Sequence, residues 1–322
     1  MGIVEVSDFA LFHSEISEKV NFSLLIYDLV TITSMSKFLI DSSIRISQVH
    51  LRVSNIDKSL QFYESFLGFK IVERNSHNVF LSPDGKMPYL VALSKAKSSD
   101  VNQQRSAGLY HFAILLPQRK DLGNFLANLL KHKNEVKIDG FSDHLVSEAI
   151  YIRDPDHIGI EIYRDRPHAE WVWDDNQVQM TLDPLNTQSL LAESDNPWTE
   201  IPAKTMIGHV HLHVSNLAKA KKFYAEILGF VNTASMHGAL FFAAGNYHHH
   251  IATNVWLGEN IPNASTDFSG LDYFTIKFSS KTKLDEVISR LGSNKITIKE
   301  LKDESDSFEI SDEDKISIHL VC

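Results

Sequence analysis

Three residues in this chain have the types and surroundings expected of metal ligands: His50, His111 and Glu161. Each lies inside a short apolar run, and these runs are residues 49–53, 110–115 and 158–162. If the runs are strands, each candidate ligand points away from the face that its apolar neighbours share. A carboxylate between isoleucines is costly to bury unless it is paired or metal-bound. Two histidines and one carboxylate form the set that holds non-haem Fe(II) and leaves coordination positions open. The pattern therefore predicts a metal site.

Composition narrows the class of protein that could hold such a site. The chain has 322 residues, which is about two domains by length, and 43% of them are hydrophobic and 22% charged. A formal net charge of -10 argues against nucleic acid or an anionic membrane surface as a partner. The single cysteine, Cys322, allows no intrachain disulfide and fits a reducing compartment, so we expect a cytoplasmic protein.

The first 44 residues match nothing later in the chain, and we expect them to be a poorly packed N-terminal extension. Their most apolar stretch is too short to span a membrane, and it lacks the basic start and cleavage site of a secretory signal. Met35 precedes Ser-Lys-Phe and would be a plausible native start. Our hypothesis is that residues 1–34 lie upstream of the native protein.

An internal repeat fixes the expected architecture of the remaining chain. Residues 49–55, Val-His-Leu-Arg-Val-Ser-Asn, return as residues 210–216, Val-His-Leu-His-Val-Ser-Asn. Because the same offset also relates several later segments, the chain is one unit written twice. We predict a first domain over residues 45–166, an ordered linker over 167–204 and a second domain over 205–322.

Each half divides again into two units of the same plan. In residues 108–163 a strand is followed by a helix over 119–131 and then by three strands, and the other quarters repeat this order. Four βαβββ modules, paired into two domains, give an α+β fold. A single module would leave one sheet face bare, so we expect curved mixed sheets that enclose a cup.

Four segments carry a family resemblance, and these are residues 108–115, 143–149, 154–163 and 247–251. With them, residues 46–322 resemble the vicinal oxygen chelate superfamily, which includes glyoxalase I, bleomycin-resistance proteins and extradiol ring-cleaving dioxygenases. The two-domain layout is similar to that of the bacillus-type catechol 2,3-dioxygenase branch. Folds of this superfamily host several reactions, so the fold alone does not fix the activity.

The resemblance implies roles for individual residues. The family's ligands lie on the first strand of one module and on the first and last strands of the next, and His50, His111 and Glu161 match those places. The family's active-site tyrosine is matched by Tyr151, and a histidine outside the ligand set by His144. The implied activity is Fe(II)-dependent extradiol cleavage of a catechol-like aromatic by O₂, with Mn, Zn or Ni as other metals that the site could take.

Two features depart from the family pattern. Well-known extradiol enzymes carry the triad in their second half, where this chain retains His211 but has Tyr273 and His319 at the other two places. The family's acid–base histidine has no counterpart in residues 87–93, and the run 248–250, three histidines, occupies its place in the second half. Whether His211, His213, His248, His249 and His250 hold a second metal or have structural roles is left open by the sequence.

Two other activities remain open at this point. A glyoxalase-like lyase or isomerase using Zn, Ni or Mn would be indicated by four protein ligands, whereas three indicate iron. A metal-free protein that binds an aromatic compound or an antibiotic would lack the triad. The exact substrate and the oligomeric state, a homo-oligomer included, are not fixed by the sequence.

Overall fold

The fourfold repeat appears as four modules, each with one helical segment between its first strand and a three-strand meander. The computed structural model describes residues 38–98, 105–302 and 306–322. Modules 1 and 2 consist of β1 (Arg45–Val53), α2 (Ile56–Leu60), π-helical η1 (Gln61–Phe66), β2 (Lys70–Arg74), β3 (Asn78–Ser82) and β4 (Val91–Lys95), then β5 (Gly108–Leu115), α3 (Arg119–Lys131), β6 (Lys137–Asp143), β7 (Ser147–Arg153) and β8 (Gly159–Asp165).

Modules 3 and 4 repeat this plan after the linker. They consist of β12 (Met206–His213), α5 (Leu217–Lys221), π-helical η3 (Lys222–Ile227), β13 (Val231–Met236), β14 (Ala239–Ala243) and β15 (Ile251–Asn254), then β16 (Gly270–Lys277), α6 (Lys281–Ser293), β17 (Lys299–Glu300), β18 (Ser307–Ser311) and β19 (Ser317–Val321). The predicted α+β class and its four βαβββ modules are confirmed.

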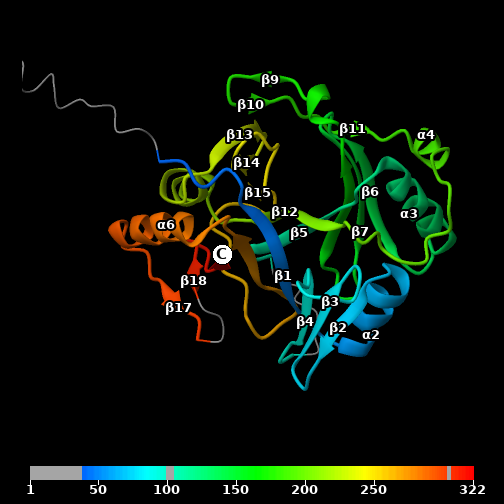
Figure 1. Ribbon diagram of the computed structural model, residues 1–322, viewed down its shortest axis with the longest axis horizontal. Coiled ribbons are helices and arrows are strands. Elements are labelled where there is room, and N and C mark those ends of the chain that lie inside the picture. The colour runs from blue at the N-terminus through cyan, green and yellow to red at the C-terminus, as the bar shows by residue number, and fades with distance from the viewer. Residues whose placement is uncertain (1–37, 99–104, 303–305) are drawn as a thin grey trace, which may run out of the picture. The chain divides into compact units, whose positions relative to one another are not determined.

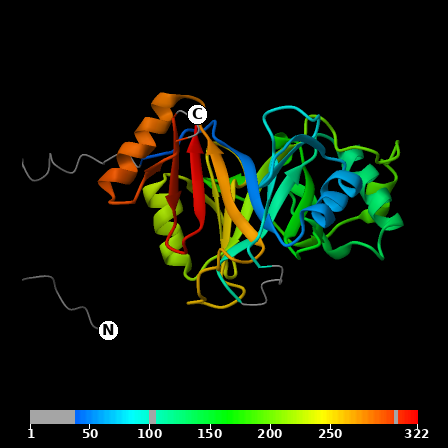
Figure 2. The ribbon, with the colours of Figure 1, turned by 90° about the horizontal axis from the view of Figure 1, so that it is seen from below.

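The sheets combine modules from opposite halves of the chain. One sheet has the order β17-β18-β19-β16-β1-β4-β3-β2 and joins module 1 to module 4. The other begins with β11 (Asp183–Pro184) of the linker, has the order β11-β6-β7-β8-β5-β12-β15-β14-β13, and joins module 2 to module 3. Figure 2 shows the first of these junctions, with blue β1 beside orange β16. We call the curved faces of these sheets the 1–4 cup and the 2–3 cup.

This pairing differs from the expectation that each half of the chain closes its own cup. The first strands of modules meet at the centre of each sheet, β1 with β16 and β5 with β12, both antiparallel. Sequence repeats show that first strands can pair, but they do not show which pair will form. The difference matters because the predicted ligands His50 on β1 and His111 on β5 then lie in different sheets; both strands are labelled in Figure 1.

Buried tyrosine–aspartate bonds tie the modules of each half together. Tyr63 of η1 donates to Asp154, in the turn before β8, over 3.0 Å, and Tyr224 of η3 donates to Asp312, in the turn before β19, over 2.9 Å. In both turns the other carboxylate oxygen accepts two backbone N–H groups. Sequential modules are therefore joined by side chains, while the sheets join modules from opposite halves.

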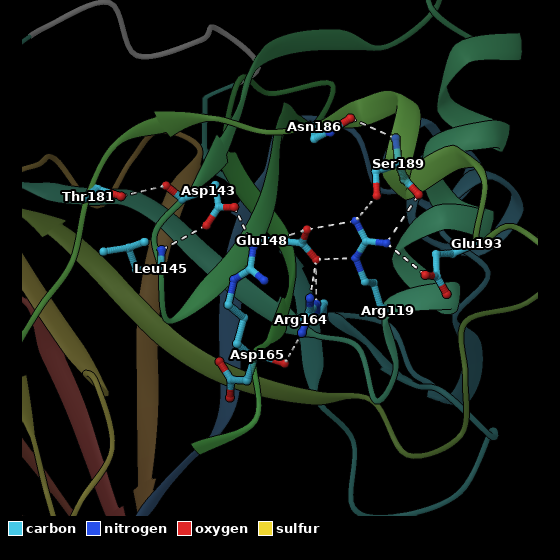
Figure 3. A network of polar contacts seen from close by, with 11 residues as sticks. Arg119, Asp143, Leu145, Glu148, Arg164, Asp165, Thr181, Asn186, Ser189 and Glu193 are labelled. Carbon is cyan, nitrogen blue, oxygen red and sulfur yellow. Dashed lines mark hydrogen bonds and ion pairs between the residues drawn. The ribbon is translucent and has the colours of Figure 1, made fainter. Parts of the chain in front are cut away.

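The outer face of the nine-stranded sheet carries a buried ion-pair network (Figure 3). Glu148 of β7 is 2% exposed and accepts hydrogen bonds from Arg119 at the start of α3 and from Arg164 of β8. Arg119 also donates to Ser189 of α4 (Thr187–Leu191). Because a buried carboxylate needs such partners, the network fixes the helices against the outer face and leaves the cup free.

The linker is ordered, and its short elements are η2 (His168–Glu170), β9 (Trp173–Asp174), β10 (Gln177–Val178), β11 (Asp183–Pro184) and α4. Residues 38–44 are also packed, since Ile40 and Ile44 are only 4% and 3% exposed, unlike the loose extension expected there. The expectation for residues 1–37 lies outside the described residues. Within the described part of the chain, no helix has both the length and the apolar character needed to cross a membrane.

Candidate metal centre

Three buried side chains converge inside the 2–3 cup: His111 of β5, Glu161 of β8 and His209 of β12. One ligand atom from each lies within 4.8 Å of the others. Glu161 Oε2 is 3.0 Å from His111 Nε2 and 3.1 Å from His209 Nε2. Their side chains are at most 5% exposed. Two imidazoles and one carboxylate in this arrangement form a facial metal-binding set.

The strand register explains why these three residues meet. Ala113 of β5 is paired in parallel with Glu161 and in antiparallel with His209, so the two ligands lie on either side of one position. A bulge follows Ile207 in β12, at Gly208. A side chain at Gly208 would clash with Tyr163, whose hydroxyl lies 1.7 Å from where a Cβ would stand. Glycine therefore permits the local geometry beside His209.

Unpartnered nitrogens support a metal at this place. Neither ring nitrogen of His111 has a hydrogen-bond partner among the described residues, and the same holds for Nδ1 of His209. His111 Nε2 approaches Glu161 closely, but at an angle that makes no hydrogen bond. Buried polar atoms without partners are uncommon and require an explanation. A cation between the three side chains would satisfy His111 Nε2, so the donor set fits a divalent metal.

Electrostatics hold the group in the protonation states that bind metals. Burial by itself raises the pKa of Glu161, but the neighbouring His209 and His111 imidazoles bring that pKa well below its usual range. Burial lowers the pKa of His209 to about 4, against the opposing effect of Glu161. At neutral pH the site thus presents an ionised carboxylate and a neutral His209, which are the ligand forms of these side chains.

Of the three ligands predicted from sequence, the structure brings together His111 and Glu161 but not His50. His50 lies on β1 in the other sheet, where it is paired with Tyr273 of β16. Its place is taken by His209, which the sequence analysis did not select. The repeat aligns His50 with His211, yet the residue that meets Glu161 stands two positions earlier on the same face of β12. Alternation of His209, His211 and His213 in the sequence was the available signal.

Tyr151 lies beside Glu161 and is bonded to His144. Tyr151 of β7 is paired with Glu161 across the β7–β8 ladder, and its hydroxyl is 2.7 Å from His144 Nε2. His144 Nδ1 donates to the Thr181 carbonyl over 2.7 Å, which leaves Nε2 of a neutral imidazole as an acceptor for the tyrosine. Burial and the Glu161 charge raise the pKa of Tyr151 well above its usual value.

The five histidines that the sequence left open, at positions 211, 213, 248, 249 and 250, each have a hydrogen-bond partner outside the converging group. Asn254 holds two of them, since its amide nitrogen is 2.9 Å from His211 Nε2 and its oxygen accepts from His213 Nδ1 over 2.7 Å. His250 Nδ1 accepts the backbone N–H of Ala244 over 3.2 Å. Among the described residues, none of the five belongs to the converging ligand group.

His249 reaches the metal centre from the wall formed by module 3. Its ring lies 4.1 Å from that of His209, and its Nδ1 is 2.7 Å from His248 Nδ1. His248 Nε2 is in turn 2.9 Å from an oxygen of Asp165. If His248 donates to Asp165 as a neutral imidazole, its Nδ1 accepts from His249. His249 Nε2 is then the nitrogen with a lone pair.

A cavity of about 300 Å³ opens above the ligands. Its walls include the three candidate ligands, Tyr151 of β7, His144 in the turn before β7 and His249 in the segment before β15. Met180 and Leu182 of the linker also line it. The volume is at the small end of the range for ligand sites and suits one ring with a short substituent. Metal ligands and hydrogen-bonding groups thus face one common space.

Two sequence comparisons found relatives of this chain. The profile of the Glyoxalase/Bleomycin resistance protein/Dioxygenase superfamily matches residues 45–162 and 206–300. The chain is 42% identical over 272 residues to the catechol-2,3-dioxygenase of Bacillus subtilis strain 168, covering 83% of this chain and 93% of that protein.

Solved structures share the fold at low sequence identity. A dioxygenase candidate from Bacillus subtilis superposes with a TM-score of 0.61 at 11% identity, covering 88% of this chain and 86% of the other. A glyoxalase I variant from Zea mays superposes with a TM-score of 0.52 at 16% identity, covering 87% and 92%. The profile match and the 42% identity show that the chain belongs to the Glyoxalase/Bleomycin resistance protein/Dioxygenase superfamily.

Proposed function

We propose that this protein is an Fe(II)-dependent extradiol dioxygenase that cleaves a catechol-like aromatic ring. The observation that carries the proposal is the convergence of His111, Glu161 and His209 on a cavity that also receives Tyr151 and His249. The 42% identity to a protein named catechol-2,3-dioxygenase supports the same reaction. The net change would break the ring bond next to the diol and add both atoms of O₂ to the product.

His111, His209 and Glu161 would hold the metal, which supplies a template and a positive charge for an oxygen-chelating substrate and O₂. One ionised carboxylate with two neutral imidazoles leaves a divalent site with a net positive charge, which favours an anionic catecholate. Because the ligands are rigid strand residues, they would also position the substrate within the cup.

Tyr151, His144 and His249 would manage protons around the substrate. The Tyr151 hydroxyl donates its proton to His144 Nε2, so its oxygen would accept a hydrogen bond from a hydroxyl of the bound substrate at the module 2 wall. His249 Nε2 would accept a hydroxyl proton from the module 3 wall, with its tautomer set through His248 and Asp165. The proton-handling groups of the family, which neither half of the sequence contains alone, would be assembled from both halves.

The number of ligands favours this reaction over a glyoxalase-like one. Within the described residues the converging group has three members, which leaves positions for substrate and O₂, whereas a four-ligand site would suit Zn or Ni isomerase chemistry. A metal-free binding protein would not need buried histidine nitrogens without partners. The open three-residue set is what an iron dioxygenase requires.

The test is to purify the protein anaerobically, load it with Fe(II), and follow catechol loss and oxygen uptake together. We expect one O₂ consumed per catechol. The same protein loaded with Zn(II) is the control, because Zn(II) binds such ligands but has no redox chemistry. Full Fe(II) occupancy with bound catechol and no oxygen uptake would contradict ring cleavage and favour the isomerase alternative.

A further inference from the structure

Few charged side chains line the cavity. Apart from the histidines, the charged side chains on its described wall are Asp139, Arg153 and Glu161. Glu161 belongs to the metal centre. Arg153 of β7 and Asp139 of β6 pair with each other, with Arg153 Nε 2.5 Å from an Asp139 oxygen. Arg153 also donates from Nη1 to the His157 carbonyl over 2.8 Å.

Asp139 balances the positive charge of Arg153, which would otherwise attract an acidic substrate. Both side chains line the cavity and are somewhat more than a quarter exposed, so they remain partly open to solvent. A carboxylate on a bound ring would find Arg153 already paired and would lie near the Asp139 charge. Like charges across a binding site oppose association and select against the wrong ligand.

The rest of the wall is apolar and extends to the surface. Met236 of β13, Phe241 of β14 and Trp256 form it on one side, and Met180 and Leu182 of the linker contribute from the other chain segment. Trp256 and Leu182 are 47% and 65% exposed, which is unusual for such large apolar side chains. The Trp256 indole is held in place by a 3.1 Å bond to the His237 carbonyl. Such a surface binds apolar groups of a ligand.

We infer that the substrate is a catechol with a short, uncharged apolar ring substituent, and that Asp139 excludes carboxylated catechols by neutralising Arg153. The inference rests on the proposed dioxygenase function for the position of the diol. It goes beyond that function, since neither the ligands nor the proton-handling groups distinguish one ring substituent from another.

The test compares two ligands of similar size, neutral 4-ethylcatechol and anionic 3,4-dihydroxyphenylacetate. Protein loaded with Zn(II) is titrated with each, and dissociation constants are read from tryptophan fluorescence, so no turnover is required. A Trp256→Phe variant shows that the signal arises at the cavity. We expect wild type to bind 4-ethylcatechol at least about tenfold more tightly, because a paired cation offers the carboxylate no compensation.

The variant Asp139→Asn should free Arg153 and narrow this preference by about tenfold, through tighter binding of the acid. The Arg153 guanidinium should keep its position in this variant, because the His157 carbonyl still accepts a hydrogen bond from it. Adding Arg153→Gln should restore the preference. Asp57→Asn is the matched control, since it removes the same charge from an exposed pair with Arg74 in module 1. That control should leave the ratio unchanged.

Three outcomes would overturn the inference. They are equal binding of both ligands by wild type, an Asp139→Asn ratio no different from that of Asp57→Asn, and binding of neither catechol. The first two leave the dioxygenase proposal standing, because it requires only that catechols bind and consume O₂. Tight binding of 4-ethylcatechol without oxygen uptake on the Fe(II) protein would instead overturn the dioxygenase proposal and leave the ligand preference supported.

Discussion

The 2–3 cup and the 1–4 cup are built on the same strand register but carry different side chains. In the 2–3 cup, Ala113 of β5 is paired with both His209 and Glu161. In the 1–4 cup, Thr275 of β16 is paired in the same two ways with Gln48 and His319. Likewise His111 stands opposite His211, and Tyr273 stands opposite His50. Gln48, Tyr273 and His319 therefore occupy the places of the three ligands.

Aromatic contacts take the place of ligand convergence in the 1–4 cup. The rings of Tyr273 and His319 stack with centroids 3.6 Å apart, and His50 meets Tyr273 edge-on at 4.8 Å. Position 319 carries histidine where the 2–3 cup has a carboxylate, and position 48 carries glutamine where the 2–3 cup has an imidazole. The comparison teaches that the duplicated scaffold supplies positions, while metal binding depends on the residues placed there.

The largest expected effect separates His209 from His50. His209→Ala should lower metal affinity by at least about a hundredfold, because it removes one of three ligands, whereas His50→Ala should leave metal content unchanged. Metal analysis of both variants after anaerobic purification, with unfolding temperature as a check on folding, decides the matter. Metal loss in His50→Ala together with full occupancy in His209→Ala would mean that the 1–4 cup is the metal site.

Sequence reasoning recovered the fold and part of the centre for identifiable reasons. The 161-residue offset between Val49 and Val210 reports the duplication, and alternation in strands places His111 and Glu161 on the faces opposite their apolar neighbours. Tyr151 falls beside Glu161 and His144 bonds to Tyr151, while the roles that the resemblance implies for them stay predictions. These predictions depended on periodicity within a strand or on spacing within a single module.

The third ligand was missed because it depends on pairing between modules. His50 would approach His111 only if β1 paired with β5, but β5 pairs with β12 and β1 with β16. No local pattern distinguishes these pairings, because all four first strands are similar apolar runs. The same pairing brings His249 from module 3 to the cavity formed with module 2, so the histidine that we propose as the acid–base group comes from the half opposite to that of His111 and Glu161.

Giving the 1–4 cup the three residue types of the candidate ligands tests whether the backbone positions of the two cups are equivalent. The combined variant Gln48→His, Tyr273→His and His319→Glu should raise the metal content from about one to about two per chain. We expect the new site to be roughly 10–100-fold weaker, since it lacks the outer groups that orient the ligands in the 2–3 cup. Metal content is measured by equilibrium dialysis.

The matched control for this exchange is the double variant that keeps His319. Without the carboxylate the second site should stay empty. Unchanged stoichiometry in the well-folded triple variant would show that the backbone positions of the two cups are not equivalent.

A smaller effect is expected when Glu161 loses only its charge. Glu161→Gln keeps the size of the side chain but removes the anionic ligand, so metal affinity should fall by about tenfold or more. With excess Fe(II) restoring occupancy, oxygen uptake should remain low while catechol still binds, which an oxygen electrode and an absorbance scan together detect. His319→Gln at the equivalent place in the 1–4 cup is the control and should alter neither property. Normal oxygen uptake by Glu161→Gln would exclude the carboxylate from the reaction.

The smallest expected effect concerns the buried tyrosine–aspartate hydrogen bond that both halves of the chain contain. Tyr63→Phe and Tyr224→Phe each remove one donor to a buried aspartate, Asp154 or Asp312, without changing ring packing. Each should lower the free energy of unfolding by about 1–3 kcal/mol, because the carboxylate loses a buried hydrogen bond. Urea unfolding of the metal-free protein is the measurement.

Both tyrosines are fully buried and their bonds differ by 0.1 Å, so we expect similar losses. The double variant should show the sum within about 0.5 kcal/mol, since the two bonds share no partner. If only Tyr63→Phe were destabilising, the tyrosine–aspartate bond would matter only in the half that carries His111 and Glu161. Equal losses would instead mean that both halves need the tie between sequential modules, although among the described residues only the 2–3 cup brings candidate metal ligands together.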